Sequence, residues 1–267
     1  MQAATLPASY GWQWVKDGLK IFGKQPMPMF FWAMALSLFV LFATRAQFIG
    51  PLLFVALMPV FTLMALAACK HISAGRIMVP SMWRRPLLRP GVFRKLFLMG
   101  LLYAALGLLA GLVAFIPFWG ELSAALRLVQ IQQDIMPFLE AVRAPLLIFV
   151  VLYVIVAALF WHAPALVAWH NLRLIQAMFF SAIACWRNKW AFLVYGVVWA
   201  LVFLCIDLAA SLLVAIGLDA TIVTILQMPV QLAAGAVFYS TLYPIYTTTF
   251  GIEDHAAALD NSDPASA

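Results

Sequence analysis

Residues 191–216 read AFLVYGVVWALVFLCIDLAASLLVAI and contain a single charged side chain, Asp207. A helix needs about 20 apolar residues to cross the hydrocarbon core of a bilayer, so this run predicts one membrane span. Similar windows lie elsewhere in the chain, at about residues 27–44, 48–69, 96–119, 145–169 and 222–250. The sequence therefore predicts an all-α fold, a polytopic integral membrane helical bundle of about six transmembrane helices.

The composition of the whole chain agrees with a membrane protein. Of the 267 residues, 66% are hydrophobic and only 10% are charged, and the mean hydropathy is +1.01. A soluble domain carries about a quarter charged residues, so too few polar side chains are present to cover a water-facing surface. This excludes a disordered chain and a nucleic-acid-binding module, although the net charge is +6. Cys69, Cys185 and Cys205 are scattered without metal-ligand spacing, and we expect reduced thiols.

Lys and Arg are distributed unevenly among the segments between these windows. Thirteen lie before the first window, in residues 70–95 or in residues 173–189, and only Arg45, Arg127 and Arg143 lie in the alternate segments. Because basic residues are retained on the cytoplasmic side, both termini are predicted to be cytoplasmic. We expect one integral membrane domain, residues 1–250, and an acidic, disordered cytoplasmic tail, residues 251–267.

Two stretches directly before spans are predicted to be amphipathic helices in the headgroup layer. The first has an apolar stripe at helical spacing, formed by Trp12, Val15, Leu19 and Phe22. The second covers residues 174–190 and ends in aromatic and basic anchors. Aligning the two stretches pairs Lys24-Gln25 with Arg187-Asn188. We attribute this faint repeat to the shared demands of a lipid interface rather than to duplication.

A motif-rich stretch begins near the end of the fourth window. It reads Phe160-Trp161-His162-Ala163-Pro164-Ala165-Leu166-Val167 and continues with Ala177-Met178, Ser181, Ala184-Cys185, Arg187-Asn188 and Phe192-Leu193-Val194-Tyr195-Gly196. Gly11-Trp12-x-Trp14 and Phe22-x-Lys24-Gln25-Pro26 open the chain. Together these residues resemble the signature of a family of bacterial inner-membrane proteins, with a layout similar to the YciC-like group. The family has no assigned reaction, so the resemblance implies a place in the bacterial inner membrane and supplies no catalytic residue.

The loop at residues 70–95 is strongly basic. Its candidate binding residues are Arg76, Arg84, Arg85, Arg89, Arg94 and Lys95. A cation near an anionic membrane surface contributes about 1 kcal/mol to binding, so we expect this face to meet anionic lipid headgroups on the cytoplasmic side, and it could also dock a protein partner. The competing interpretation is a signal for membrane orientation that binds nothing.

Asp207 is the most informative polar residue within the predicted spans. Gln227 and Gln231 lie four residues apart in the next window and could hydrogen-bond it if the two helices form a hairpin. Intramembrane acids often mark ion or proton paths. A hydrogen-bonded carboxyl that joins two helices is the interpretation we favour, because the spans offer no second acid or basic partner.

The remaining polar and small residues carry weaker signals. His162 and His170 are eight residues apart, which places them on different faces of a helix, and we interpret both as interfacial histidines rather than metal ligands. Residues 121–143 read as a weakly amphipathic helix interrupted by Pro137. A face of small residues in the third window suits close helix packing or a homo-oligomer seam: Gly100, Ala104, Gly107 and Gly111.

Sequence signatures of catalysis are missing. The chain has no Gly-x-Ser-x-Gly, no His-Glu-x-x-His and no phosphate-binding glycine loop. We therefore predict a non-enzymatic protein without cofactor or metal, a membrane scaffold or envelope-maintenance component that interacts with lipids or a protein partner. The alternative is a small transporter or channel in which Asp207, Gln227 and Gln231 line a path.

Overall fold

The computed structural model describes residues 3–47 and 49–251, and the described residues are helical with short connections. The predicted tail from residue 252 onward lies outside the described residues. The helices run in the order α1 Tyr10–Lys24, α2 Pro26–Arg45, α3 Ile49–Ser73, α4 Pro80–Arg84, α5 Val92–Phe115, α6 Trp119–Gln132, α7 Met136–Phe160, α8 Ala163–His170, α9 Leu174–Arg187, α10 Lys189–Ala215 and α11 Ala220–Phe250. Two 3-10 turns, η1 Arg85–Leu88 and η2 Ile116–Phe118, connect α4 to α5 and α5 to α6.

Six of these segments are long and apolar enough to cross a membrane, which confirms the predicted fold class. They are α2, α3, α5 with α6, α7 with α8, α10 and α11. The fourth differs from the expected window of 145–169, because α7 ends at Phe160 and a new helix begins at Ala163. Pro164 lies in the first turn of α8. Proline cannot donate the backbone hydrogen bond of a continuing helix, so the chain turns there.

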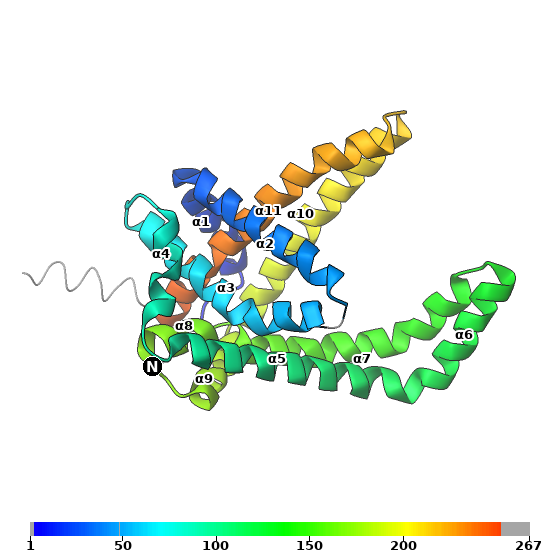
Figure 1. Cartoon of the computed structure of the whole chain (residues 1–267), viewed down its shortest axis with the longest axis horizontal. Helices are drawn as coiled ribbons and strands as arrows, with labels where there is room; N and C mark the ends of the chain where they lie inside the picture. The colour runs from blue at the N-terminus through cyan, green and yellow to red at the C-terminus, as the bar shows by residue number, and fades with distance from the viewer. Residues whose placement is uncertain (1–2, 48, 252–267) are drawn as a thin grey trace, which may run out of the picture.

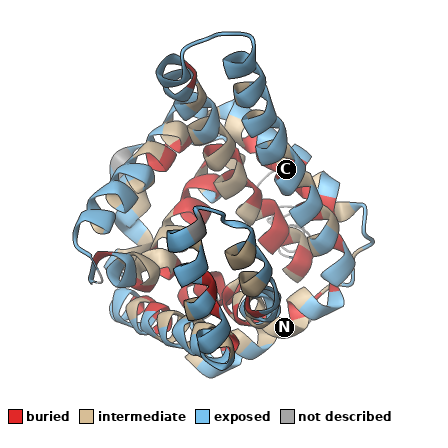
Figure 2. Cartoon of the chain, turned by 90° about the vertical axis from the view of Figure 1, so that its right-hand side faces the viewer, coloured by how far each residue is buried: buried red, intermediate tan, exposed pale blue. Residues whose placement is uncertain are grey.

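The helices form a shared base from which two long hairpins project (Figure 1). One hairpin consists of α10 and α11. In the other, the chain runs outward through α5 and α6 and returns along α7. The short helices α4, α8 and α9 lie at the opposite end from the hairpin tips. Viewed toward the tips, the hairpins in front are largely exposed, whereas buried residues gather farther back (Figure 2). A lipid-facing surface of this kind explains why so many large apolar side chains are exposed.

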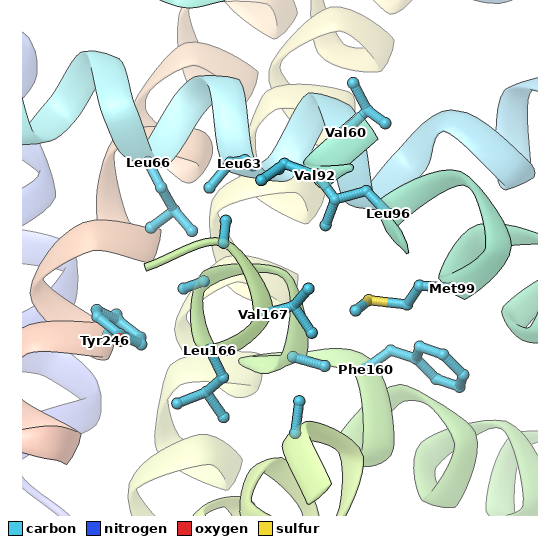
Figure 3. Close-up of a cluster of buried hydrophobic side chains, with 14 of the residues drawn as sticks. Val60, Leu63, Leu66, Val92, Leu96, Met99, Phe160, Leu166, Val167 and Tyr246 are labelled. Carbon is cyan, nitrogen blue, oxygen red and sulfur yellow. The ribbon is translucent and has the colours of Figure 1, made fainter. Parts of the chain in front are cut away.

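Helix α8 is the centre of the largest buried cluster. Leu166 and Val167 of α8 lie among residues of α3, α5, α7 and α11 (Figure 3). Residues 163–168 are all buried, and three of them are alanines. Small side chains let neighbouring helices approach closely, and van der Waals packing then stabilises the base.

The packed faces of the two amphipathic helices include small residues, and in α1 the packed face overlaps the predicted apolar stripe only in part. In α1, Gly11, Trp14, Val15, Gly18 and Ile21 are buried, whereas Trp12 and Leu19 of the predicted stripe are about half exposed. In α9 the buried residues are Ala177, Ser181 and Ala184. The expected apolar stripe of α1 is therefore only partly its buried face. Close approach decides the packing face, since a Cβ at Gly18 would lie 2.4 Å from Thr241 of α11.

Candidate functional site

The cations of the described chain are concentrated at the end where α1, α4, α8 and α9 lie, which we call the basic end. It contains thirteen Lys and Arg residues: Lys16, Lys20, Lys24, Lys70, Arg76, Arg84, Arg85, Arg89, Arg94, Lys95, Arg173, Arg187 and Lys189. Among the described residues, Asp17 is the one acid here, and it is paired with Lys20 at 2.9 Å. The other described acids lie on the two hairpins: Glu121, Asp134, Glu140, Asp207 and Asp219.

A glutamine anchors the basic loop after α3. The Gln25 side chain donates through Nε2 to the carbonyl of Arg76 at 2.8 Å and accepts through Oε1 from the backbone N–H of Met78 at 2.9 Å. Lys24 Nζ donates to the carbonyl of Ser73 at 3.3 Å. The carboxamide thus holds an extended segment by two hydrogen bonds, each contributing on the order of 1 kcal/mol.

An asparagine has the same role at the start of α10. Asn188 donates through Nδ2 to the carbonyl of Ala4 at 2.9 Å and accepts through Oδ1 from the backbone N–H of Leu6 at 2.8 Å. Gln25 and Asn188 are the residues that the faint sequence repeat aligns. Each precedes a span and binds a C=O and an N–H two residues apart. Sequence reasoning identified the alignment but missed this function of the amides, because their partners are distant in the chain.

The six predicted basic residues of the loop are all exposed. Their backbone is supported on its buried side, where the Trp83 ring of α4 lies 5.6 Å from the Trp32 ring of α2, tilted by 44° to it, and where Met78 is buried. Arg89 contacts the carbonyl of Ala168 in α8 at 3.5 Å. The guanidinium groups of Arg84 and Arg85 are therefore presented to the outside on a supported backbone.

A cavity of about 310 Å³ opens between the start of α5 and the connection from α8 to α9. Its lining residues are Lys95, Leu98, Val167, Asn171, Leu172, Arg173 and Leu174. Lys95 Nζ donates to Asn171 Oδ1 at 2.8 Å. The lining thus combines two cations and an amide with four apolar side chains. Lys95 was predicted from sequence, whereas Asn171 and Arg173 were missed because only tertiary packing brings them beside it.

The structure brings two of the three predicted intramembrane polar residues together. Gln227 Nε2 donates to Asp207 Oδ1 at 2.7 Å, joining α10 to α11. Gln231 is exposed, and the structure gives no hydrogen bond from its side chain among the described residues. Asp207 is itself exposed and lies about 27 Å along α10 from Lys189, at 1.5 Å per residue. That distance approaches the roughly 30 Å thickness of the hydrocarbon core, so the carboxylate lies toward its far edge.

The interpretation of both histidines as interfacial is wrong for His162. Its side chain is only 3% exposed, and its imidazole ring contacts the rings of Phe192, Tyr246 and Phe250. His170 is half-buried and its Nε2 lies 2.7 Å from the hydroxyl of Tyr246. The break between α7 and α8 changes the predicted geometry, so both histidines meet the same tyrosine. The described residues contain no group of three potential metal ligands.

The cysteines do not pair with one another in the described chain. Cys69 is buried, Cys185 is half-buried and Cys205 is exposed. Burial raises the pKa of the Cys185 thiol to about 12, and a hydrogen bond with Ser181 opposes that rise. The Cys185 thiol is therefore protonated at neutral pH and a weak nucleophile.

Comparison with known proteins gives one informative likeness. The chain is 29% identical over 270 residues to a probable inner membrane protein of Burkholderia thailandensis, and the match covers 96% of this chain and 97% of the relative. The relative is thus described as a probable inner membrane protein, and the described part of this chain has six helices long and apolar enough to cross a membrane. No family model matches the chain, and no solved structure matches it. The likeness agrees with the resemblance seen in the sequence, and the relative's name carries no specific activity.

Proposed function

We propose that this chain is a non-enzymatic scaffold or envelope-maintenance component of the inner membrane that gathers anionic lipids at its basic end. Both termini are then cytoplasmic, since cations are retained on that side. A protein partner with an acidic surface, or a second copy of the chain, would add to the lipid contacts without replacing them.

The observation that carries this proposal is the separation of charge between the two ends. Thirteen cations and one described acid lie at the basic end, against two cations, Arg127 and Arg143, and five described acids on the hairpins, while the remaining cation, Arg45, ends α2. The leaflet of a bacterial membrane presents anionic headgroups, and a cation near it contributes about 1 kcal/mol to the attraction. The exposed Arg84, Arg85 and Arg89 are more numerous than orientation alone requires.

Mass spectrometry of native-membrane discs tests the proposal. The wild-type chain is compared with a triple variant, Arg84→Gln, Arg85→Gln and Arg89→Gln, extracted in the same way. Anionic lipid or a protein should be enriched around the wild type and depleted around the variant relative to it. Identical lipids and proteins around both would overturn the proposal and leave the loop as an orientation signal.

A transporter or channel built on Asp207 is not favoured. The carboxylate lies on an exposed two-helix hairpin and is engaged by Gln227. The test is Asp207→Cys in a background lacking Cys69, Cys185 and Cys205, treated with a membrane-impermeant thiol reagent. Rapid labelling from both sides of the membrane would reveal a hydrated path and revive this alternative.

A further inference from the structure

We propose that the cavity between α5 and the α8–α9 connection binds the headgroup phosphate of an anionic phospholipid, one molecule per chain. The inference rests on the proposed function and names the place where one lipid is held specifically. Its three donors are Lys95 of α5 and Asn171 and Arg173 of the α8–α9 connection.

Charge and hydrogen bonding in the cavity suit a phosphate. None of the described residues that line the cavity is acidic, so Lys95 and Arg173 face no carboxylate inside it. Lys95 uses one donor on Asn171 Oδ1 and keeps two more, while the Asn171 Nδ2 group is a further donor. A guanidinium and an ammonium together match a phosphodiester, to which arginine binds in bidentate geometry.

Two helix N-termini strengthen the positive potential there. Arg94 and Lys95 lie in the first turn of α5, and Leu174 begins α9, whose N-cap residue Arg173 provides no side-chain cap. The positive end of a helix dipole repels cations by about 0.3–1 kcal/mol, so Arg94 and Lys95 are placed unfavourably unless an anion is bound nearby. Unsatisfied N–H groups at a helix N-terminus favour the same anion.

The surroundings identify the anion as part of a lipid. Ile175 and Phe179 on the outer face of α9 are 79% and 61% exposed, and Trp186 continues that stripe. Such a stripe on an amphipathic helix lies at the boundary between headgroups and acyl chains, which sets the depth of α9. Leu98 is half-exposed at the wall of the cavity, where an acyl chain leaving the headgroup would contact it. The cavity volume of about 310 Å³ is large enough for a headgroup, and the acyl chains would remain outside the cavity.

The test compares two variants that lose the same charge. Lys95→Gln with Arg173→Gln changes the cavity, and Arg84→Gln with Arg85→Gln changes the exposed loop outside it. Each full-length protein is placed in phosphatidylcholine discs containing a minor fraction of phosphatidylglycerol, then extracted into detergent at physiological salt. Native mass spectrometry counts the phosphatidylglycerol molecules retained per chain.

The wild type and the loop variant should each retain one phosphatidylglycerol, and the cavity variant should retain at least about tenfold less. Asn171→Asp, which keeps the left-handed backbone at φ 50° accessible, should weaken retention by placing an acid in the cavity.

Equal loss of phosphatidylglycerol from the cavity and loop variants would overturn the cavity as a specific site while leaving general lipid binding intact. Full retention in the cavity variant would also overturn it. Displacement of the retained lipid by inorganic phosphate would assign the site to a free anion instead. Failure of the proposed function itself would appear separately, as an unchanged lipid profile in the triple arginine variant.

Discussion

At Gly100, the backbone of α5 lies in close contact with the backbone of α3. A Cβ added there would lie 1.8 Å from the carbonyl oxygen of Ala56 and 2.5 Å from its carbonyl carbon. Both atoms belong to the backbone, so no side-chain rotation relieves the clash and the two helices must separate. Gly107 lies two turns further along the same helix, and a Cβ there meets nothing within 4 Å.

These two glycines form a matched pair of predictions. Gly100→Ala should lower the unfolding free energy by about 2 kcal/mol or more, because the added methyl group collides with backbone atoms of α3 that cannot move aside. Gly107→Ala should raise it by up to about 1 kcal/mol, because alanine is the better helix former. Thermal unfolding in one detergent measures both. Equal melting temperatures for the two variants would contradict the close crossing of α3 and α5.

Asp207 can be tested by a substitution that keeps its acceptor. Asp207→Asn removes the charge but still accepts from Gln227, and interhelical hydrogen bonds in membranes contribute only about 0.6 kcal/mol on average. We expect the variant to insert and fold with an unfolding free energy within about 1 kcal/mol of the wild type. Folded protein in the membrane fraction is the measurement, with Gln231→Ala as a neutral control. Loss of the folded chain would instead mean that the fold requires the charged carboxylate of Asp207.

Helix α11 begins with a cap that depends on pH. The Asp219 carboxylate accepts from the backbone N–H of Thr221 at 2.8 Å and of Ile222 at 3.2 Å. The hydrogen bonds from Ile222 and Thr221 hold the pKa of Asp219 below its ordinary value of 3.8. Because the pKa is lower in the folded state, the cap stabilises the helix above that value and is lost as the pH falls through the folded pKa.

Hydrogen exchange in the first turn of α11 checks this prediction. Relative to Asp219→Asn, which caps without titrating, the wild type should exchange equally at neutral pH and faster only below about pH 3.8. Reporting the ratio of the two proteins removes the intrinsic effect of pH on exchange. A ratio that stays constant down to pH 2 would mean that the carboxylate does not cap the helix.

The elements that follow from local composition were predictable, and those that depend on tertiary contacts were not. Apolar length located five of the six spans to within a few residues, because the bilayer sets the length of a helix that crosses it. The end of the fourth span was misplaced, since nothing local distinguishes the turn before Pro164 from a kinked helix. Exposed arginines of the loop could be named from their type and position. Asn171 and Arg173 could not be grouped with Lys95, because the cavity exists only once α8 has packed against α5.

Across the whole molecule, burial and charge follow the same axis. Helix α3 is half buried in its most apolar window, whereas that of α10 is 6% buried, so the base is packed and the hairpins are surrounded by lipid. Lys189 lies 4.7 Å over Trp186 and 5.9 Å over Trp190, an aromatic and basic anchor at the level where α10 enters the membrane. The packed base thus coincides with the basic end, which is the arrangement expected of an inward-facing platform.

The orientation of that platform is directly testable with two exposed positions. Ser81 lies on α4 at the basic end, and Asp134 lies between α6 and α7 at a hairpin tip. In a background lacking the three cysteines, Asp134→Cys should react with an impermeant maleimide in intact spheroplasts, and Ser81→Cys should react only after lysis. The reason is that thirteen cations resist transfer across the membrane, whereas only Arg45, Arg127 and Arg143 lie away from the basic end. Inside-out vesicles provide the control, because the order of labelling must reverse. Labelling of Ser81→Cys in intact spheroplasts would place the basic end outside and remove the basis for its contact with cytoplasmic-leaflet lipids.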